Sequence, residues 1–507
     1  MKIGLRPLGR FLKASLEKLN SGESLFTRAT RGGLWLGAGS GVEQLMRLAR
    51  NMIIARVIAP EAFGVMAIVL AACSALEAFT DIGVKSAVVQ NPDGHEETFL
   101  NAAWWLSFAR SVFLYAIAYA AAPWIAVFYS MPSLTPLLRV AFLSILFNGA
   151  QSAGLYVAFK DMDFKPWVAI NLGSAGAGIF STVLLVFFVP GEWALVAGYT
   201  IEAAVRCALS FALCFCLPGL KFERRHMESL WRFARGVFGL PILTNIFLQI
   251  DIFTIGKLCT PTELGLYSIA AAFSRIPFQM VGTLVGQVAM PVFSEMQEER
   301  KRSNTLILRL TAAISFLGFP MLLYVVLYSR ELLTVLYGAP YAAAAVPFAI
   351  LMATSFLRIV NVPIVTYYFA IGKPETHRLA TALRTAMIVV IIYPAVRYFG
   401  IEGGAAASLA SMLLGHVVQV FQIRETSDLG LLEYVMIFLK PSVISLLVAG
   451  VWAATYGIFG SLPVIHMTIG ALACLVSYAI AGAFILKYRK DSLLSRLIAQ
   501  SRHDGMS

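Results

Sequence analysis

The chain reads IARVIAPEAFGVMAIVLA at residues 54–71 and IGKLCTPTELGLYSIAAA at residues 255–272. The two stretches align at a constant offset of 201 positions, and each connects one long apolar segment to the next. The matched pairs are Ile54/Ile255, Arg56/Lys257, Pro60/Pro261, Gly64/Gly265, Ile68/Ile269 and Ala71/Ala272. The dipeptide at 165–166, Lys-Pro, recurs at 373–374 with a similar offset. We interpret this pattern as an internal repeat of about half the chain.

The composition around these stretches is that of a membrane protein. Of the 507 residues, 59% are hydrophobic and only 13% are charged, whereas about a quarter of the residues in a soluble domain are charged. These numbers exclude a soluble, disordered or disulfide-rich protein. The apolar runs are long and continuous rather than alternating, which also excludes a transmembrane β-barrel. We therefore expect an all-α integral membrane protein with many spans.

Fourteen apolar segments have the length of a membrane-spanning helix, which needs roughly 20 residues. They lie at 33–57, 62–88, 98–121, 134–158, 167–189, 193–217, 231–257, 264–291, 306–328, 342–370, 379–398, 402–423, 433–459 and 464–486. Helices are expected throughout, because a helix satisfies its backbone hydrogen bonds within one segment in lipid.

The basic residues predict the orientation of the spans. Lys and Arg total 40 against 28 Asp and Glu, and the bases collect in the two terminal tails and in alternate loops, as cytoplasmic segments do. This distribution explains the net charge of +12 without a nucleic-acid partner. Both termini are therefore predicted to be cytoplasmic. Leucines at helical spacing between Leu5 and Leu19 predict an amphipathic helix on the anionic leaflet or a plain basic tail.

The repeat and the spans together predict the domain organisation. Residues 32–217 form one six-helix lobe and residues 218–425 a second, parallel one, with two further spans in 426–487. A basic tail precedes them at 1–31 and another follows at 488–507. Parallel repeats are related by an axis along the membrane normal and enclose a cavity near its midplane.

Charged residues inside the spans are the candidate functional groups, because each costs roughly 2.5–3.5 kcal/mol at a helix centre. Ser40, Glu43, Arg47 and Arg50 share one face of the first span, and the second span has a comparable stripe. The other polar or charged positions are Ser74, Glu77, Asp81 and Lys85; Glu202 and Arg206; Asn245, Gln249 and Asp251; Arg275 and Gln279; and Arg110, Arg139, Arg358 and Arg384.

Two interpretations of these charges stay open. Glu43/Arg47 and Glu202/Arg206 are spaced i, i+4, so each pair can neutralise itself within one helix. Alternatively the stripes line a wet lumen. The arginines outnumber the acids, and a guanidinium fork suits phosphate. This excess favours an anionic cargo such as a lipid diphosphate head group. Short outer loops disfavour an enzyme, and the chain has no GxxxxGK[ST] motif of an ATPase.

Four stretches resemble the Wzx-type oligosaccharide flippases of the MOP superfamily. They are RVIAPEAFG at 56–64, QIDIFTIG at 249–256 with the following turn to Tyr267, PVFSEMQ at 291–297 and GIEGGAAA at 400–407. Together they extend the resemblance over nearly the whole chain. It implies a V-shaped, two-lobed flippase fold with alternating access. The implied cargo is an undecaprenyl-diphosphate-linked oligosaccharide, moved across a bacterial inner membrane for lipopolysaccharide, capsule or exopolysaccharide synthesis.

We therefore expect two groups of site residues. The diphosphate-binding candidates are Arg47, Arg50, Arg206, Arg275 and Arg358. The candidates for proton or sodium coupling are Glu43, Glu77, Asp81 and Asp251. We expect no catalytic residue, bound metal or cofactor, and the expected partners are the lipid-linked cargo, membrane lipids and the polysaccharide polymerase or export machinery.

Two alternatives remain at this point. One is a drug or cation antiporter of the same superfamily, which the arginine excess disfavours. The other is a non-transporting subunit of a polysaccharide synthase complex, which has no need of so many charges in its spans.

Overall fold

The computed structural model describes residues 25–80, 83–219, 221, 223–237, 240–297, 299–427, 429–459 and 463–488. Every regular element in these ranges is a helix, which confirms the all-α prediction. Among the described residues nine helices are long and apolar enough to cross a membrane, or ten with one bent pair. The number of fourteen spans stays a prediction. The predicted surface helix between Leu5 and Leu19 lies outside the described residues.

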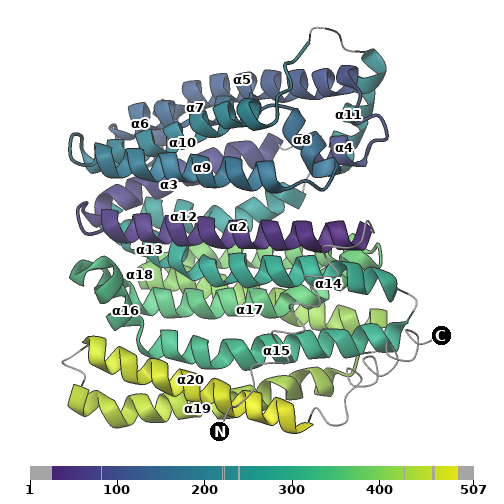
Figure 1. The fold of residues 1–507 in the computed structure, drawn as a ribbon. Coiled ribbons are helices and arrows are strands. Elements are labelled where there is room, and N and C mark those ends of the chain that lie inside the picture. The colour runs from purple at the N-terminus through teal and green to yellow at the C-terminus, as the bar shows by residue number, and fades with distance from the viewer. Residues whose placement is uncertain are drawn as a thin grey trace.

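The helices form two lobes (Figure 1). The first lobe contains α2 (Leu25–Ile54), α3 (Pro60–Thr80), α4 (Val84–Gln90), α5 (Glu97–Phe128), α6 (Leu134–Ala141), α7 (Leu143–Gly149), α8 (Gly154–Lys160), α9 (Lys165–Leu185) and α10 (Gly191–Leu213). The second contains α12 (Leu240–Leu258), α13 (Pro261–Pro277), the π-helical turn η1 (Phe278–Gly282), α14 (Thr283–Glu295), α15 (Arg300–Leu327), α16 (Ser329–Tyr337), the 3-10 turn η2 (Ala339–Ala344), α17 (Ala345–Ala370) and α18 (Pro374–Ser427). α11 (Arg224–Val237) lies between the lobes in sequence, and α19 (Leu431–Phe459) and α20 (Pro463–Tyr488) pack on α15.

The helices run between two ends of the molecule. We call the end with the α2–α3 and α12–α13 connections the turn end, and the opposite end, with α4, α8 and α11, the α11 end (Figure 1). The lobes meet mainly where α3 packs against α13 and α12, and where α2 packs against η1 and α14.

Three predicted spans are interrupted. The segment 62–88 ends as α3 at Thr80, and Gly83, with φ 62°, precedes the short helix α4. The segment 134–158 breaks into α6, α7 and α8, with a bend of 58°. The segment 231–257 begins too early, because α11 is a separate helix that packs on α4 and α5. α11 reads RRHMESLWRFARGV, which is too polar for lipid.

α18 is a hairpin of two helices. A straight helix of its 54 residues would be about 81 Å long, yet Gln419 hydrogen-bonds to His377 at 2.8 Å. The chain reverses at Gly400, whose φ of 56° and ψ of −141° suit a residue without a Cβ. The two halves correspond to the separate predicted segments 379–398 and 402–423.

The repeated glycines are the contact between the lobes at the turn end. A Cβ on Gly64 would lie 2.1 Å from the carbonyl oxygen of Pro261, and a Cβ on Gly265 would lie 1.8 Å from that of Pro60. Each contact is the counterpart of the other with the two lobes interchanged, as a pseudo-twofold axis requires. Only glycine permits this approach of α3 to α13. The two repeated stretches in the sequence are therefore the segments that pack against each other between the lobes.

A second exchanged pair flanks the glycines. Arg56, in the turn after α2, donates to the carbonyl of Val335 in the second lobe at 2.6 Å. Its repeat equivalent, Lys257 at the end of α12, donates to the carbonyl of Phe128 in the first lobe. The basic residue of each repeat therefore reaches across to the other lobe, and the turn end is closed.

Gly64→Ala should weaken this closure. The added methyl group overlaps a backbone oxygen, and overpacking of this kind costs about 1–3 kcal/mol. We expect a lower thermal unfolding temperature for the purified protein in detergent. Gly450→Ala in α19 is the matched control, because a Cβ there meets no atom within 4 Å. Equal unfolding temperatures for the two variants would contradict the contact.

Candidate functional site

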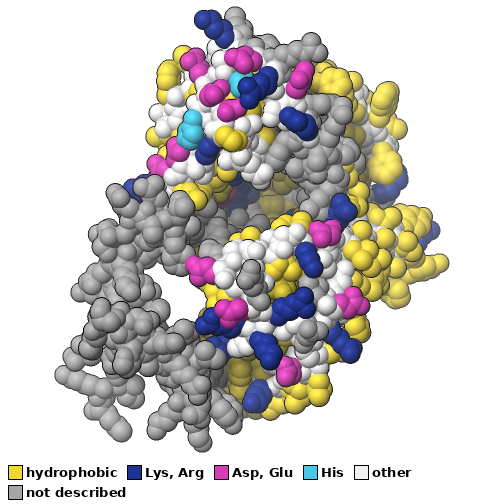
Figure 2. All heavy atoms as spheres, turned by 90° about the vertical axis from the view of Figure 1, so that its right-hand side faces the viewer, with side chains coloured by type: hydrophobic (Ala, Val, Ile, Leu, Met, Phe, Trp, Pro, Cys, Tyr) yellow, Lys and Arg dark blue, Asp and Glu magenta, His cyan; other side chains and the backbone are white. Residues whose placement is uncertain are grey.

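A polar cavity lies between the lobes. It has a volume of about 360 Å³, within the range of roughly 300–1,000 Å³ typical of ligand pockets. Its walls come from α2, α3 and α10 of the first lobe and from α12 and α13 of the second. Figure 2 looks onto the α11 end and shows a hollow between the lobes on that face.

The charged residues that line the cavity are Arg47, Arg50, Arg275 and Glu77. With three cations and one acid, the lining is net positive. Ser74, Tyr199, Gln249 and Ser268 add polar groups, and Phe63, Met66 and Leu70 add apolar ones. The cavity therefore offers both a cationic and an apolar surface to a bound molecule.

Arg47 is held in an ion-pair network. Its Nη2 donates to Glu43 Oε1 at 3.0 Å on its own helix and to Glu202 Oε1 at 2.5 Å on α10. Arg206 Nη2 donates to the same Glu202 oxygen at 2.6 Å. Glu202 is buried, with 3% of its surface exposed. The four side chains balance two positive with two negative charges, and they join α2 to α10 inside the first lobe.

Arg50 and Arg275 have neutral partners only among the described residues. Arg50 Nε donates to the side-chain oxygen of Asn51 at 3.2 Å. Arg275 Nη2 donates to the carbonyl of Leu248 at 3.1 Å. The two arginines come from α2 and α13 and line the same cavity. Because Glu43 and Glu202 offset Arg47, the positive charge of the cavity resides on these two guanidinium groups, one from each lobe, and Glu77 is the carboxylate that opposes it.

A smaller pocket continues from Arg275 into the second lobe. It has a volume of about 40 Å³ and is also lined by Asp251 and Arg358. Asp251 is 6% exposed and accepts hydrogen bonds from the Tyr267 hydroxyl at 2.7 Å and from the backbone N–H of Ile252 at 2.8 Å. A buried carboxylate that shares a pocket with two arginines lies where a cation or a proton can compete with them.

The backbone deforms beside this pocket. Pro277 ends α13, and the chain continues as the π-helical turn η1, a deviation that is frequent at functional sites. Phe278, the first residue of η1, stacks on Arg358, with 4.3 Å between the guanidinium carbon and the ring centroid. The turn therefore sets the position of one candidate arginine.

The other predicted site residues are placed as follows. Glu77 lines the main cavity and accepts a hydrogen bond from Asn148 at 3.0 Å. Asp81 lies outside the described residues. Neither Arg139 nor Arg384 lines either cavity: Arg139 stacks on Tyr119, and Arg384 stacks on Phe247, a ring that lines the smaller pocket.

Two tyrosines at the site were not predicted. Tyr267 holds Asp251, and Tyr199 lines the cavity. Tyr267 lies inside the second repeat stretch but matches the apolar Met66 at the repeat offset. The alignment of the two stretches therefore did not indicate a polar role for this position. His416 in α18 bonds to Asn361 at 3.1 Å and is a packed, buried histidine.

The comparisons with known proteins place the chain in a family. Residues 53–346 match the family model described as "Polysaccharide biosynthesis protein". The chain belongs to this family. The transport protein ExoT for succinoglycan biosynthesis of Rhizobium meliloti (strain 1021) is 25% identical over 460 residues, which is 89% of this chain and 91% of ExoT. The teichuronic acid biosynthesis protein TuaB of Bacillus subtilis (strain 168) is 23% identical, with 83% and 87% covered.

Solved structures show the same fold. The lipid II flippase MurJ in an inward closed conformation aligns with a TM-score of 0.73 at 16% identity, over 89% of this chain and 99% of MurJ. An inward-facing MATE multidrug transporter of the MOP superfamily aligns with a TM-score of 0.61 at 14% identity, over 76% and 96%. The two-lobed helical fold that the sequence motifs imply is therefore confirmed as the fold of these two structures, and the chain is a multi-pass membrane protein.

Glu202→Gln should destabilise the first lobe. Removing one partner of a buried ion pair costs about 3–5 kcal/mol, and here two arginines lose a shared carboxylate. We expect a marked drop in unfolding temperature in detergent. Glu299→Gln is the control, because its pair with Arg302 is half exposed and such pairs contribute about 0–1 kcal/mol. If Glu202→Gln is as mild as the control, the network does not stabilise the lobe.

Proposed function

We propose that the protein is a flippase that moves a lipid-linked oligosaccharide across the membrane for polysaccharide biosynthesis. The observation that carries the proposal is the pair Arg50 and Arg275, which line one cavity from opposite lobes and whose hydrogen bonds among the described residues go to neutral oxygens. Family membership and the transport named for a relative support the same conclusion. The protein acts as a transporter, not as an enzyme.

The cavity chemistry favours a diphosphate-linked polyprenol, of the undecaprenyl class, as cargo. Each phosphate of such a diester carries a negative charge, which matches the surplus positive charge of the cavity. Arg50 and Arg275 bind the diphosphate, and Arg358 extends the cationic surface into the second lobe. Arg47 and Arg206 act indirectly, because Glu43 and Glu202 already neutralise them. Their part is to hold Arg50 and the wall of α2 in place.

The closed turn end supports alternating access. The glycine contacts and the exchanged Arg56 and Lys257 contacts join the lobes there, while the hollow lies on the face of the α11 end (Figure 2). The Lys- and Arg-rich loops predict that the α11 end is cytoplasmic, with both termini on that side of a bacterial inner membrane. The structure then corresponds to a state loaded from the cytoplasm, and separation of the turn end releases cargo outside.

Asp251 is the best candidate for ion coupling. Its buried carboxylate lines the small pocket together with Arg275 and Arg358, so a proton or Na⁺ on Asp251 frees these arginines from its charge. Such coupling requires that the ion and the cargo prefer different states of the transporter. Glu77 contributes a second carboxylate in the main cavity.

A drug or cation antiporter is less consistent with the site. An organic cation in the cavity would meet the guanidinium groups of Arg50 and Arg275, opposed by the single carboxylate of Glu77. The electrostatic energy of that arrangement is unfavourable in a medium of low dielectric constant.

Arg50→Ala and Arg275→Ala should each abolish export of the surface polysaccharide without loss of folded protein from the membrane. The reason is the loss of one half of the diphosphate clamp. Export is measured by surface polysaccharide in cells that depend on this chain. Arg139→Ala is the control, since Arg139 also lies in an apolar helix but stacks on Tyr119 away from the cavity. Normal polysaccharide in both cavity variants would refute the proposal.

Asp251→Asn should uncouple transport. In proteoliposomes with a Na⁺ or pH gradient, we expect the wild-type protein to flip a diphosphate-linked glycan lipid faster when the gradient is present. The variant should still bind this lipid but gain nothing from the gradient. Asp163→Asn, at an exposed loop position, should behave as the wild type. Gradient stimulation that persists in Asp251→Asn would exclude this carboxylate as the coupling site.

A further inference from the structure

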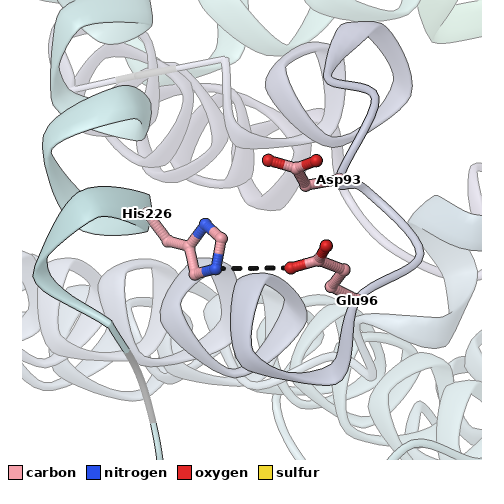
Figure 3. Close-up of side chains that lie close together, drawn as sticks. All are labelled: Asp93, Glu96 and His226. Carbon is pink, nitrogen blue, oxygen red and sulfur yellow. Dashed lines mark ion pairs between the residues drawn. The ribbon is translucent and has the colours of Figure 1, made fainter.

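A cluster of possible metal ligands lies at the α11 end, away from the cavity. Asp93 and Glu96 come from the connection between α4 and α5, and His226 comes from the first turn of α11 (Figure 3). One ligand atom from each of the three lies within 4.8 Å of the other two. Because these residues are separated by about 130 positions in the chain, a bound ion would connect the first lobe to the segment that leads to the second.

The histidine is buried and its ring nitrogen faces oxygen atoms. His226 is 4% exposed. Its Nε2 lies 3.5 Å from Glu96 Oε2, 3.7 Å from Glu223 Oε2 and 3.2 Å from Thr98 Oγ1. Phe99 packs edge-on against the ring, with 5.3 Å between the centroids, and fixes its plane. The ring therefore offers one nitrogen to a group of carboxylates.

The carboxylate of Glu96 does not cap the helix that it precedes. Glu96 is the N-cap residue of α5, where an acidic side chain usually accepts a hydrogen bond from the helix backbone. Here it makes no such cap and is directed at His226 instead (Figure 3). Neither Asp93 nor Glu96 forms an ion pair with a described Lys or Arg. The nearby ammonium group of Lys160 donates to the backbone carbonyl of Pro92 at 3.2 Å rather than forming an ion pair with either carboxylate.

We propose that Asp93, Glu96 and His226 bind a divalent transition-metal ion of the Mn²⁺ or Zn²⁺ class, with Glu223 as a fourth ligand. Imidazole suits zinc and its neighbours, and carboxylates suit Mn²⁺. An ion between them balances the carboxylate charge, and small movements of the two exposed glutamates bring the ligand atoms to bonding distance. Site residues in the transport cavity take no part.

The surroundings indicate what the ion does. The segment after α10 is already attached to α5, because Asn101 bonds to the backbone of Gly219 and Lys221 at 2.8 Å and 3.2 Å. Trp105 Nε1 also donates to the Gly219 carbonyl at 3.0 Å. The metal adds a stronger link further along the same segment. The ion therefore links α11 to the first lobe at the α11 end, on the face where the hollow between the lobes lies.

Mn²⁺ binding tests the site. Tag-free protein in detergent is stripped with a chelator and titrated with Mn²⁺, and electron paramagnetic resonance measures the free ion. We expect one saturable site per chain, with ¹⁴N coupling from the imidazole in the pulsed spectrum and displacement by Zn²⁺. His226→Gln should lose the nitrogen coupling and bind at least about tenfold more weakly.

Two further variants keep the test decisive. Asp93→Asn lies in a loop, so it should fold even if His226→Gln does not; it should weaken Mn²⁺ binding but keep the nitrogen coupling. His95→Gln is the matched control, because His95 pairs with Asp161 outside the cluster. Absence of saturable Mn²⁺ binding, or wild-type binding in both Asp93→Asn and His226→Gln, would overturn the proposal and leave a hydrogen-bonded ion pair.

Discussion

The rest of the structure depends on the close approach of two helices at Gly64 and Gly265. Because a Cβ at either position would lie on a backbone oxygen of the other lobe, α3 and α13 can approach only where the chain supplies glycine. That contact joins the lobes at the turn end. It also sets α2 and α13 at a separation that leaves a cavity further along, where Arg50 and Arg275 lie.

The second constraint is electrostatic. An arginine in an apolar environment needs a partner, and the first lobe provides one for Arg47 and Arg206 through Glu202. The repeat does not reproduce that network, since Arg47 matches Leu248 and Arg50 matches Asp251 at the repeat offset. The second lobe instead places Asp251 under Tyr267 and beside Arg275. The two lobes therefore share a backbone arrangement but differ in the charged residues they contribute. This difference is consistent with a transporter that binds an anionic cargo and a coupling ion at different positions between the lobes.

Much of this organisation could be predicted from the sequence because it depends on local spacing. The Pro60/Pro261 and Gly64/Gly265 matches indicate the two lobes, and the i, i+4 spacing of Glu43/Arg47 and Glu202/Arg206 indicates ion pairs within helices. The network across helices was not predictable, because nothing local states that Glu202 faces α2. Pro277 signals a break in its span, but not the π-helical turn or the stacking of Phe278 on Arg358. The polar composition of 224–237 contained the signal for a separate α11, which the apolar residues after it obscured.

The central claim is that one arginine from each lobe recognises a diphosphate. The most direct measurement is the affinity of the purified protein for a polyprenyl diphosphate compared with the matching monophosphate, in the wild type and in Arg275→Gln. Two guanidinium groups that share a diphosphate predict tighter binding of the diphosphate by the wild type. They also predict that most of this preference disappears in Arg275→Gln. Equal affinity for the two lipids, or a preference that survives in the variant, would contradict the account.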